Sequence, residues 1–215
     1  MSDAYPSALE RNVRLRDGEV IHLRPIRADD AGRLVDFHGL LSPHSVYLRF
    51  FSFHPVLSAP EVQRFTNVDY VDRLALVVER DGRLLAVGRY DRLADTSDAE
   101  VAFIVSDDYQ GEGIGTLLAD ELAKAAWERG ITRFFAETLA GNSEMLDVFR
   151  GLGFPLTSSF GQGVVRVQFP IEPVREYVAG LSRREAGRAV SPAGAALLAE
   201  RPARDDDGVP GANPC

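Results

Sequence analysis

The sequence of 215 residues has almost no cysteine, no long apolar run and no excess of basic residues. Its only cysteine is Cys215, so no disulfide can form within the chain, and we expect a reducing, cytoplasmic setting. No run of about 18 apolar residues is present, and the first residues lack an apolar signal segment, which argues against a membrane span and against secretion. The net charge of −8 argues against a nucleic-acid partner and is compatible with a cationic one.

The remaining composition, 45% hydrophobic and 26% charged, is typical of a globular domain. The four histidines are scattered without the spacing of metal ligands, so we predict no metal site. The run Asp205–Asp207 is interpreted as a solvated charge cluster near the end of the chain.

Turn and cap signals set the predicted order of elements, in which two strands form a hairpin around Asp17-Gly18 and three helices follow. Strands are then predicted over residues 74–79 and 84–90, joined by a turn at Asp81-Gly82, and over 99–105, 133–139 and 164–169. Helices are predicted over 114–129 and 144–150. This order predicts an α/β (α+β) domain, with a mixed, mostly antiparallel sheet of about seven strands flanked by helices on both faces.

The same patterns divide the chain into three parts. Residues 1–19 are a lead-in, residues 20–170 form the domain, and residues 171–215 are an Ala/Pro/Arg-rich tail. We expect this tail to be largely disordered, with weak helices over residues 173–180 and near 193–200, because it has little to bury.

The central stretch, residues 99–130, combines an apolar strand, a glycine-rich loop and a helix start. The loop reads Gln110-Gly111-Glu112-Gly113-Ile114-Gly115, and it is followed by Thr116. Glycines let backbone amides approach an anion closely, and the first amides of a helix have no partner inside it, so this stretch predicts a phosphate site. No Gly-Lys-Ser/Thr follows, and the loop does not lie in a first βαβ unit, which excludes a P-loop and a dinucleotide fingerprint.

Gln110-x-x-Gly113-x-Gly115 resembles the Q/R-x-x-G-x-G/A motif of the GNAT superfamily of acyl-CoA-dependent N-acetyltransferases. The segment from Asn142 through Phe149 to Gly153-Phe154 resembles the family's N-x6-Y/F-x3-G-F segment. The phrases HLRPIRADD and LSPHSVYLRFF in the N-terminal half are most similar to the catalytic domain of bacterial protein lysine acetyltransferases of the Pat type. The resemblance covers roughly residues 20–169.

The resemblance implies a GNAT fold and an acetyl-CoA site. It implies that the amides of Gln110–Thr116 hold the pyrophosphate, with Glu112 and Ile114 inside this loop. The pantetheine arm would pair with the strand backbone, as an added strand would; this part of the strand comprises Phe103, Ile104 and Val105. Asn142 would bind the pantetheine, Phe149 would pack near the sulfur, and Arg150 is a candidate for the CoA phosphates.

A lysine ammonium has a pKa of about 10.4 and must lose its proton before it attacks a thioester, so a general base is required. Glu100, in an otherwise apolar strand, is the candidate, because its position matches the glutamate base of the enzymes it resembles, and burial would raise its pKa toward neutrality. Many GNAT enzymes have a tyrosine acid at the position of Phe149, and phenylalanine cannot donate a proton.

The leading hypothesis is acetyl transfer from acetyl-CoA to the ε-amine of a protein lysine, without a metal. The resemblance suggests an AMP-forming acyl-CoA synthetase as the protein acceptor. Two alternatives stay open: transfer to a small-molecule or N-terminal amine, and an acyl-CoA sensor that binds without turnover.

Overall fold

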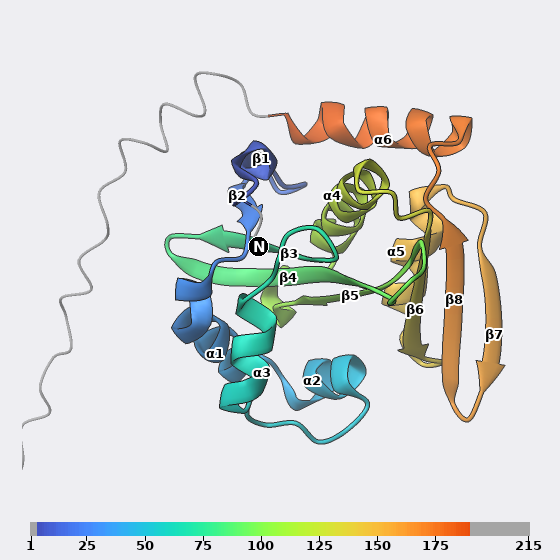
Figure 1. Cartoon of the computed structure of the whole chain (residues 1–215). Helices are drawn as coiled ribbons and strands as arrows, with labels where there is room; N and C mark the ends of the chain where they lie inside the picture. The colour runs from blue at the N-terminus through green and yellow to red at the C-terminus, as the bar shows by residue number, and fades with distance from the viewer. Residues whose placement is uncertain (1–3, 190–215) are drawn as a thin grey trace, which may run out of the picture.

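The computed structural model describes residues 4–189, which form a single mixed sheet with helices on both faces (Figure 1). The strands are β1 (Arg11–Arg14), β2 (Val20–Pro25), β3 (Arg73–Arg80), β4 (Arg83–Arg92), β5 (Asp98–Val105), β6 (Arg133–Leu139), β7 (Thr157–Gly161) and β8 (Val164–Pro170). The helices are α1 (Ala31–Leu40), α2 (Pro43–Phe50), α3 (Ala59–Thr66), α4 (Ile114–Glu128), α5 (Ser143–Leu152) and α6 (Arg175–Arg188). None of the helices within residues 4–189 has the length and apolar character to cross a membrane.

The eight strands lie in the order β1-β2-β3-β4-β5-β6-β8-β7, and only the β5/β6 pair is parallel. The predicted fold class is therefore confirmed, with one strand more than the seven expected. The additional strand is β7, whose residues are all exposed and lack an alternating pattern. It forms because a tight turn places it against β8, with which it pairs. A strand that is held by backbone pairing alone needs no hydrophobic side chains, so its sequence shows no hydrophobic pattern.

Local signals explain where α2 and α3 begin. The side chain of Ser42 accepts a hydrogen bond from the backbone N–H of Ser45 and caps α2. Ser58 and Glu61 form a capping box at the start of α3, as the spacing of these two residues predicts. Each of these helices has a proline in its first turn, where the missing N–H is of no consequence.

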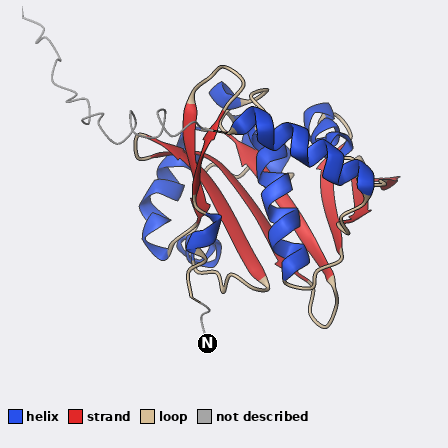
Figure 2. Cartoon of the chain, turned by 90° about the horizontal axis from the view of Figure 1, so that it is seen from above, coloured by secondary structure: helices blue, strands red, loops and turns tan. Residues whose placement is uncertain are grey.

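Two apolar clusters lie on opposite faces of the sheet. The larger one packs α4, α5 and part of α6 over the central strands and includes Leu118, Phe134 and Phe149. The smaller one packs α1, α2 and α3 on the other face and includes Phe37 and Val77. Figure 2 shows α4 lying across the sheet, with α6 crossing above it. The sheet thereby separates two environments, and β5 contributes side chains to both.

We expected residues 171–215 to be largely disordered, and the structure corrects this prediction for residues 175–188. These residues form α6, a longer helix than the one expected over residues 173–180. The fully buried carboxylate of Asp120 in α4 binds Arg184 at 2.7 Å and Arg188 at 2.9 Å, so charge pairing compensates for the weak hydrophobic pattern. The second predicted helix, near residues 193–200, and the end of the tail lie outside the described residues.

Candidate active site

The central feature of the site is a gap between β5 and β6. These parallel strands pair only at Asp98, Ala99 and Glu100 of β5, opposite residues 133–135 of β6. Beyond Glu100 the two strands run on without a shared ladder, and Figure 1 shows them diverging. A cavity of about 400 Å³ lies at this gap, bounded by β5, β6, α2, α5 and the glycine loop.

The exposed edge of β5 presents backbone groups to the cavity. Ser106 N–H bonds to Leu85 C=O, which fixes which residues of β5 face β4. Because backbone groups alternate along an antiparallel strand, the N–H and C=O groups of Ala102 and Ile104 also face β4. Those of Phe103 and Val105 therefore face the gap. Ile104 lines the cavity, but its backbone groups are engaged with β4, which corrects its predicted backbone role.

The glycine loop closes one end of the cavity. Gly111 and Gly113 have φ values of 82° and 84°, a left-handed conformation that explains glycine at both positions. Gly115 has a different reason: a Cβ there would lie 3.2 Å from Cγ2 of Val148, so glycine permits α4 and α5 to pack closely. Gly113 is the N-cap of α4. The first backbone amides of this helix carry the positive end of the helix dipole, and they lie at the cavity.

Nearly all of the predicted site residues line this cavity: Glu100, Phe103, Ile104, Val105, Gln110, Gly111, Gly113, Ile114, Gly115, Thr116, Asn142 and Phe149. Glu112 and Arg150 are not among the lining residues. Arg150 is exposed and pairs with Asp147 at 3.0 Å on the surface of α5, since its helical position turns it away from the gap.

Glu100 lies where the β5/β6 ladder ends, at the narrow end of the gap. Its side chain is exposed, so the burial that we expected for it is absent. The half-buried Arg49 of α2 lies close enough to interact electrostatically with Glu100 and Asp91. Burial and the neighbouring Arg89 cation lower the pKa of Arg49 to about 10, and the two carboxylates oppose this shift.

Asn142 and Phe149 approach from the other face of the sheet. The side-chain oxygen of Asn142 accepts a hydrogen bond from the N–H of Met145 and caps α5, which leaves its amide N–H groups for a ligand. Phe149 is 1% exposed, with its ring centroid 6.0 Å from that of Phe103 and 5.5 Å from that of Phe169. It provides an apolar wall and no proton donor.

A hydrogen-bond network that the sequence did not predict connects α2 to the glycine loop. The Asp107 carboxylate accepts hydrogen bonds from the hydroxyls of Ser42 at 2.6 Å and Ser45 at 2.7 Å. The side-chain amide of Gln110 donates to Ser45 Oγ at 3.1 Å and to Val105 C=O at 3.2 Å. Burial of Asp107 opposes its ionisation, but the hydrogen bonds from the two serines prevail and lower its pKa. The network fixes α2 against the exposed edge of β5.

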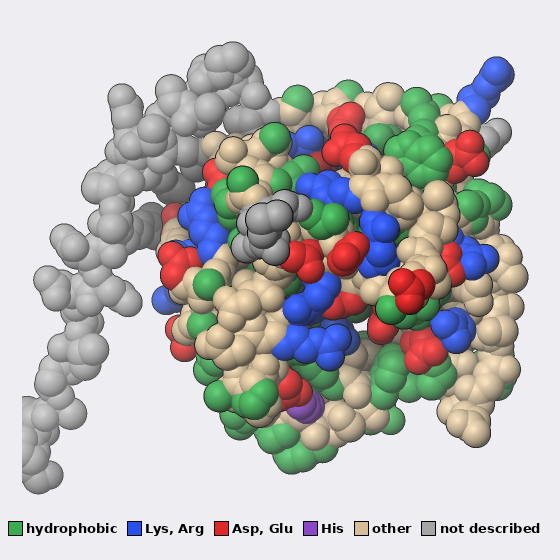
Figure 3. Space-filling view, in the orientation of Figure 1, with side chains coloured by type: hydrophobic (Ala, Val, Ile, Leu, Met, Phe, Trp, Pro, Cys, Tyr) green, Lys and Arg blue, Asp and Glu red, His purple; other side chains and the backbone are tan. Residues whose placement is uncertain are grey.

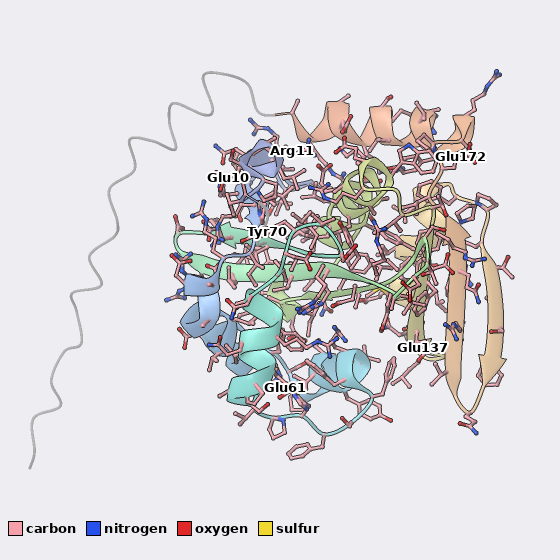
Figure 4. The ribbon with its side chains drawn as sticks, in the orientation of Figure 1. Glu10, Arg11, Glu61, Tyr70, Glu137 and Glu172 are labelled. Atoms are coloured by element: carbon pink, nitrogen blue, oxygen red, sulfur yellow. The ribbon has the colours of Figure 1, made fainter. Side chains whose placement is uncertain are left out.

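Further cavity residues come from segments far from the motif: Arg16, Leu48, Arg49, Phe51, Glu137 and Thr138. Arg16, in the first hairpin turn, donates to Gly111 C=O at 3.3 Å. Figure 4 shows Glu137 on β6, at the side toward α2. Phe50 of α2 packs against the smaller apolar cluster, and its ring stacks on that of His54 with 4.4 Å between the centroids. Its neighbours Arg49 and Phe51 line the cavity.

Within residues 4–189 no cluster of three or more His, Cys, Asp or Glu side chains is arranged to hold a metal ion.

Comparison with known proteins identifies the class of this fold and site. Residues 44–154 match the profile of the Acetyltransferase (GNAT) family. The chain is 32% identical over 144 residues to acetyltransferase PA5475 of Pseudomonas aeruginosa, covering 65% of this chain and 77% of that protein. The chain belongs to the GNAT family of acetyltransferases.

Within this family the similarity to Pat proteins is confirmed. The solved GNAT domain of S. lividans PAT is 44% identical, with a TM-score of 0.74, and the match covers 78% of this chain and 99% of that domain. Acetyltransferase Pat of Mycolicibacterium smegmatis is 33% identical over 165 residues, which cover 75% of this chain. This match spans about half (49%) of the Mycolicibacterium protein.

Proposed function

We propose that this acetyltransferase moves acetyl from acetyl-CoA to the ε-amine of a protein lysine, with Glu100 as general base. The single observation that carries the proposal is the gap between β5 and β6, which joins an amide-rich loop at one end to a carboxylate at the other. The strand from Glu100 to Val105 rises about 3.3 Å per residue, so the loop and the carboxylate are separated by an extended channel.

The donor fits the exposed edge of β5. The pyrophosphate would accept hydrogen bonds from the amides of the loop at the positive end of α4. The pantetheine arm, which is peptide-like, would pair with the free N–H and C=O of Phe103 and the free N–H of Val105 as an added strand does. One of these N–H groups would then stabilise the oxyanion that forms when the thioester carbonyl is attacked.

The acceptor would enter from the face of the sheet that carries α2, because Glu100 lies on that face. The amine nitrogen attacks the carbonyl carbon, its proton passes to the Glu100 carboxylate, and the C–S bond breaks to release the thiolate. A docked acceptor would cover the exposed Glu100 and exclude water from it, which destabilises the carboxylate anion and favours its uptake of the amine proton.

A protein acceptor is supported by the surface beside this entrance. Exposed apolar side chains follow the cavity-lining part of α2, with Phe53 86% and Val56 69% exposed, and Tyr47 lies on α2 itself. Hydrophobic side chains gather over this loop at the lower edge of the face drawn in Figure 3. Exposed apolar side chains that cluster beside a site are typical of protein contacts. An AMP-forming acyl-CoA synthetase remains a candidate acceptor, and a cytoplasmic location remains a prediction.

The test is incubation of the protein with labelled acetyl-CoA, a cell lysate and a panel of small amines, beside a Glu100→Ala variant. Label on protein lysines, lost in the variant, is the expected result. Label only on small amines would replace the lysine acceptor with the small-molecule alternative. Binding of acetyl-CoA with no transfer to any amine would favour the sensor.

A further inference from the structure

The hydroxyl of Thr138 is a buried polar group in the wall of the cavity. Thr138 of β6 is 2% exposed, and its Oγ1 hydroxyl has no hydrogen-bond partner among residues 4–189. An unpaired buried hydroxyl destabilises a fold, because it loses its hydrogen bonds to water without replacement. Thr138 lines the cavity, so a bound ligand is the available source of that missing partner.

The position of Thr138 indicates which part of the ligand it meets. Side chains alternate along a strand, so Thr138 lies on the same face of β6 as Phe134 and Ala136. These two residues share an apolar cluster with Phe103 and Phe149. Glu100 lies on the opposite face of the sheet, because it alternates with Val101 and Phe103 along β5. The base and the threonine thus flank the gap from opposite faces.

This arrangement suits a thioester under attack, in which the amine arrives on one face of the carbonyl and the sulfur departs toward the other. If the amine approaches from the Glu100 face, the sulfur departs toward the face of Thr138 and Phe149. The ring of Phe149 cannot donate a hydrogen bond. The Asn142 amide on that face is assigned to the pantetheine, and the Thr138 hydroxyl can donate to the sulfur. A thiolate is stabilised by a hydrogen-bond donor in an otherwise apolar, low-dielectric wall.

We propose that the Thr138 hydroxyl donates a hydrogen bond to the CoA sulfur and stabilises the departing thiolate. The bond that forms is C–N and the bond that breaks is C–S; the electron pair of the C–S bond stays on sulfur. Thr138 keeps its own proton, and solvent protonates the thiolate after release. The inference rests on the acetyl transfer of the proposed function and is independent of which amine accepts.

The decisive comparison is Thr138→Val against Thr138→Ser. Valine preserves the shape and removes the hydroxyl, and serine keeps the hydroxyl. We expect kcat to fall about 10-fold to 100-fold in Thr138→Val, the range of a hydrogen bond to a charged group, and to stay within about 3-fold of wild type in Thr138→Ser. The melting temperature of Thr138→Val should equal or exceed that of the wild type, because the substitution removes an unpaired buried hydroxyl.

Thr66 supplies the matched control. It is 1% exposed, and its hydroxyl donates to Val62 C=O at 2.9 Å within α3. Thr66→Val should therefore lower the melting temperature and leave kcat unchanged, the reverse of the pattern expected for Thr138→Val. A fall in both melting temperature and kcat for Thr138→Val would make Thr138 a structural residue and overturn the proposal.

A second readout needs no acceptor. In the complex with CoA, the ultraviolet absorbance of the thiolate reports the pKa of the bound thiol, which is about 8.5 for a free thiol. This pKa should be lower in the wild type and in Thr138→Ser than in Thr138→Val, by about one unit for a 10-fold effect. Equal values in all three proteins would refute the role of Thr138. Failure of lysine acetylation with a lowered thiol pKa would refute the proposed acceptor alone.

Discussion

The donor side and the acceptor side of the cavity are built in different ways. The donor side uses backbone: the free edge of β5 and the amides of the loop before α4. The acceptor side uses side chains from separate segments, among them Arg49 of α2, Glu100 of β5 and Glu137 of β6. A backbone site requires glycines at fixed spacing, whereas a side-chain site can be assembled from many sequences. The same scaffold can therefore keep one donor and change its acceptor.

The largest effect is expected from substitution of Glu100, which should impair the acceptor side and leave the donor side intact. Glu100→Gln keeps the shape of the side chain and removes the base, so kcat should fall by about 100-fold or more, while the Kd for acetyl-CoA stays within about 2-fold. Steady-state kinetics and calorimetry measure the two quantities. Glu112→Gln is the control, because Glu112 carries the same charge but lies off the cavity. Equal activity of the two variants would remove Glu100 from its proposed role.

The next effect concerns the loop on the donor side. Gly113→Ala places a Cβ 3.6 Å from Nε of Arg16 and forces alanine into a left-handed conformation, at a cost of about 1–2 kcal/mol that would distort the loop. We expect the KM for acetyl-CoA to rise about 10-fold. Gly130 has a similar φ of 76° at the far end of α4, so Gly130→Ala should lower the melting temperature comparably with no change in KM. A matching rise in KM for Gly130→Ala would attribute the effect to strain alone.

A smaller effect should appear where the two sides are joined. Ser45→Ala removes the hydroxyl that connects Asp107 to Gln110, so both the acceptor KM and the donor KM should rise about 3-fold to 5-fold. A double-mutant cycle with Gln110→Ala measures the coupling, which should be positive because the two side chains share one network. Strict additivity of the two substitutions would show that α2 and the loop act independently.

The smallest effects concern two arginines, Arg16 at the cavity and Arg150 on the surface of α5. Arg16 lies at the loop, where it donates to Gly111 C=O. Arg16→Ala should raise the KM for acetyl-CoA up to about 5-fold at low salt and less at high salt, because an exposed pair of its guanidinium with a CoA phosphate would be weak and screened. Arg150→Ala should leave this KM unchanged, since Arg150 is exposed, pairs with Asp147 and does not line the cavity. Loss of acetyl-CoA binding in Arg150→Ala but not in Arg16→Ala would reverse this assignment.

The difference between the two sides also decides what the sequence could predict. The loop around Gly113 and the strand that holds Phe103 follow from local patterns, because glycine spacing and apolar alternation are written in consecutive residues. The free edge of β5 does not follow from local patterns, because it depends on where β6 diverges from β5. Ser45, Arg16 and Thr138 reach the cavity from α2, the first hairpin and β6, and only the folded chain brings them together. The helix predicted over residues 173–180 was too short, because Arg184 and Arg188 in the second half of α6 bind the buried Asp120 through charge, which leaves no hydrophobic stripe.

The central claim is that acetyl-CoA binds along the free edge of β5, and backbone hydrogen exchange tests it most directly. The amides of Phe103 and Val105 face the gap, whereas those of Ala102 and Ile104 are already bonded to β4. Added acetyl-CoA should slow exchange at Phe103 and Val105 by about 10-fold or more and change Ala102 and Ile104 far less. Protection that is equal at all four amides, or absent from Phe103 and Val105, would contradict the proposed binding mode.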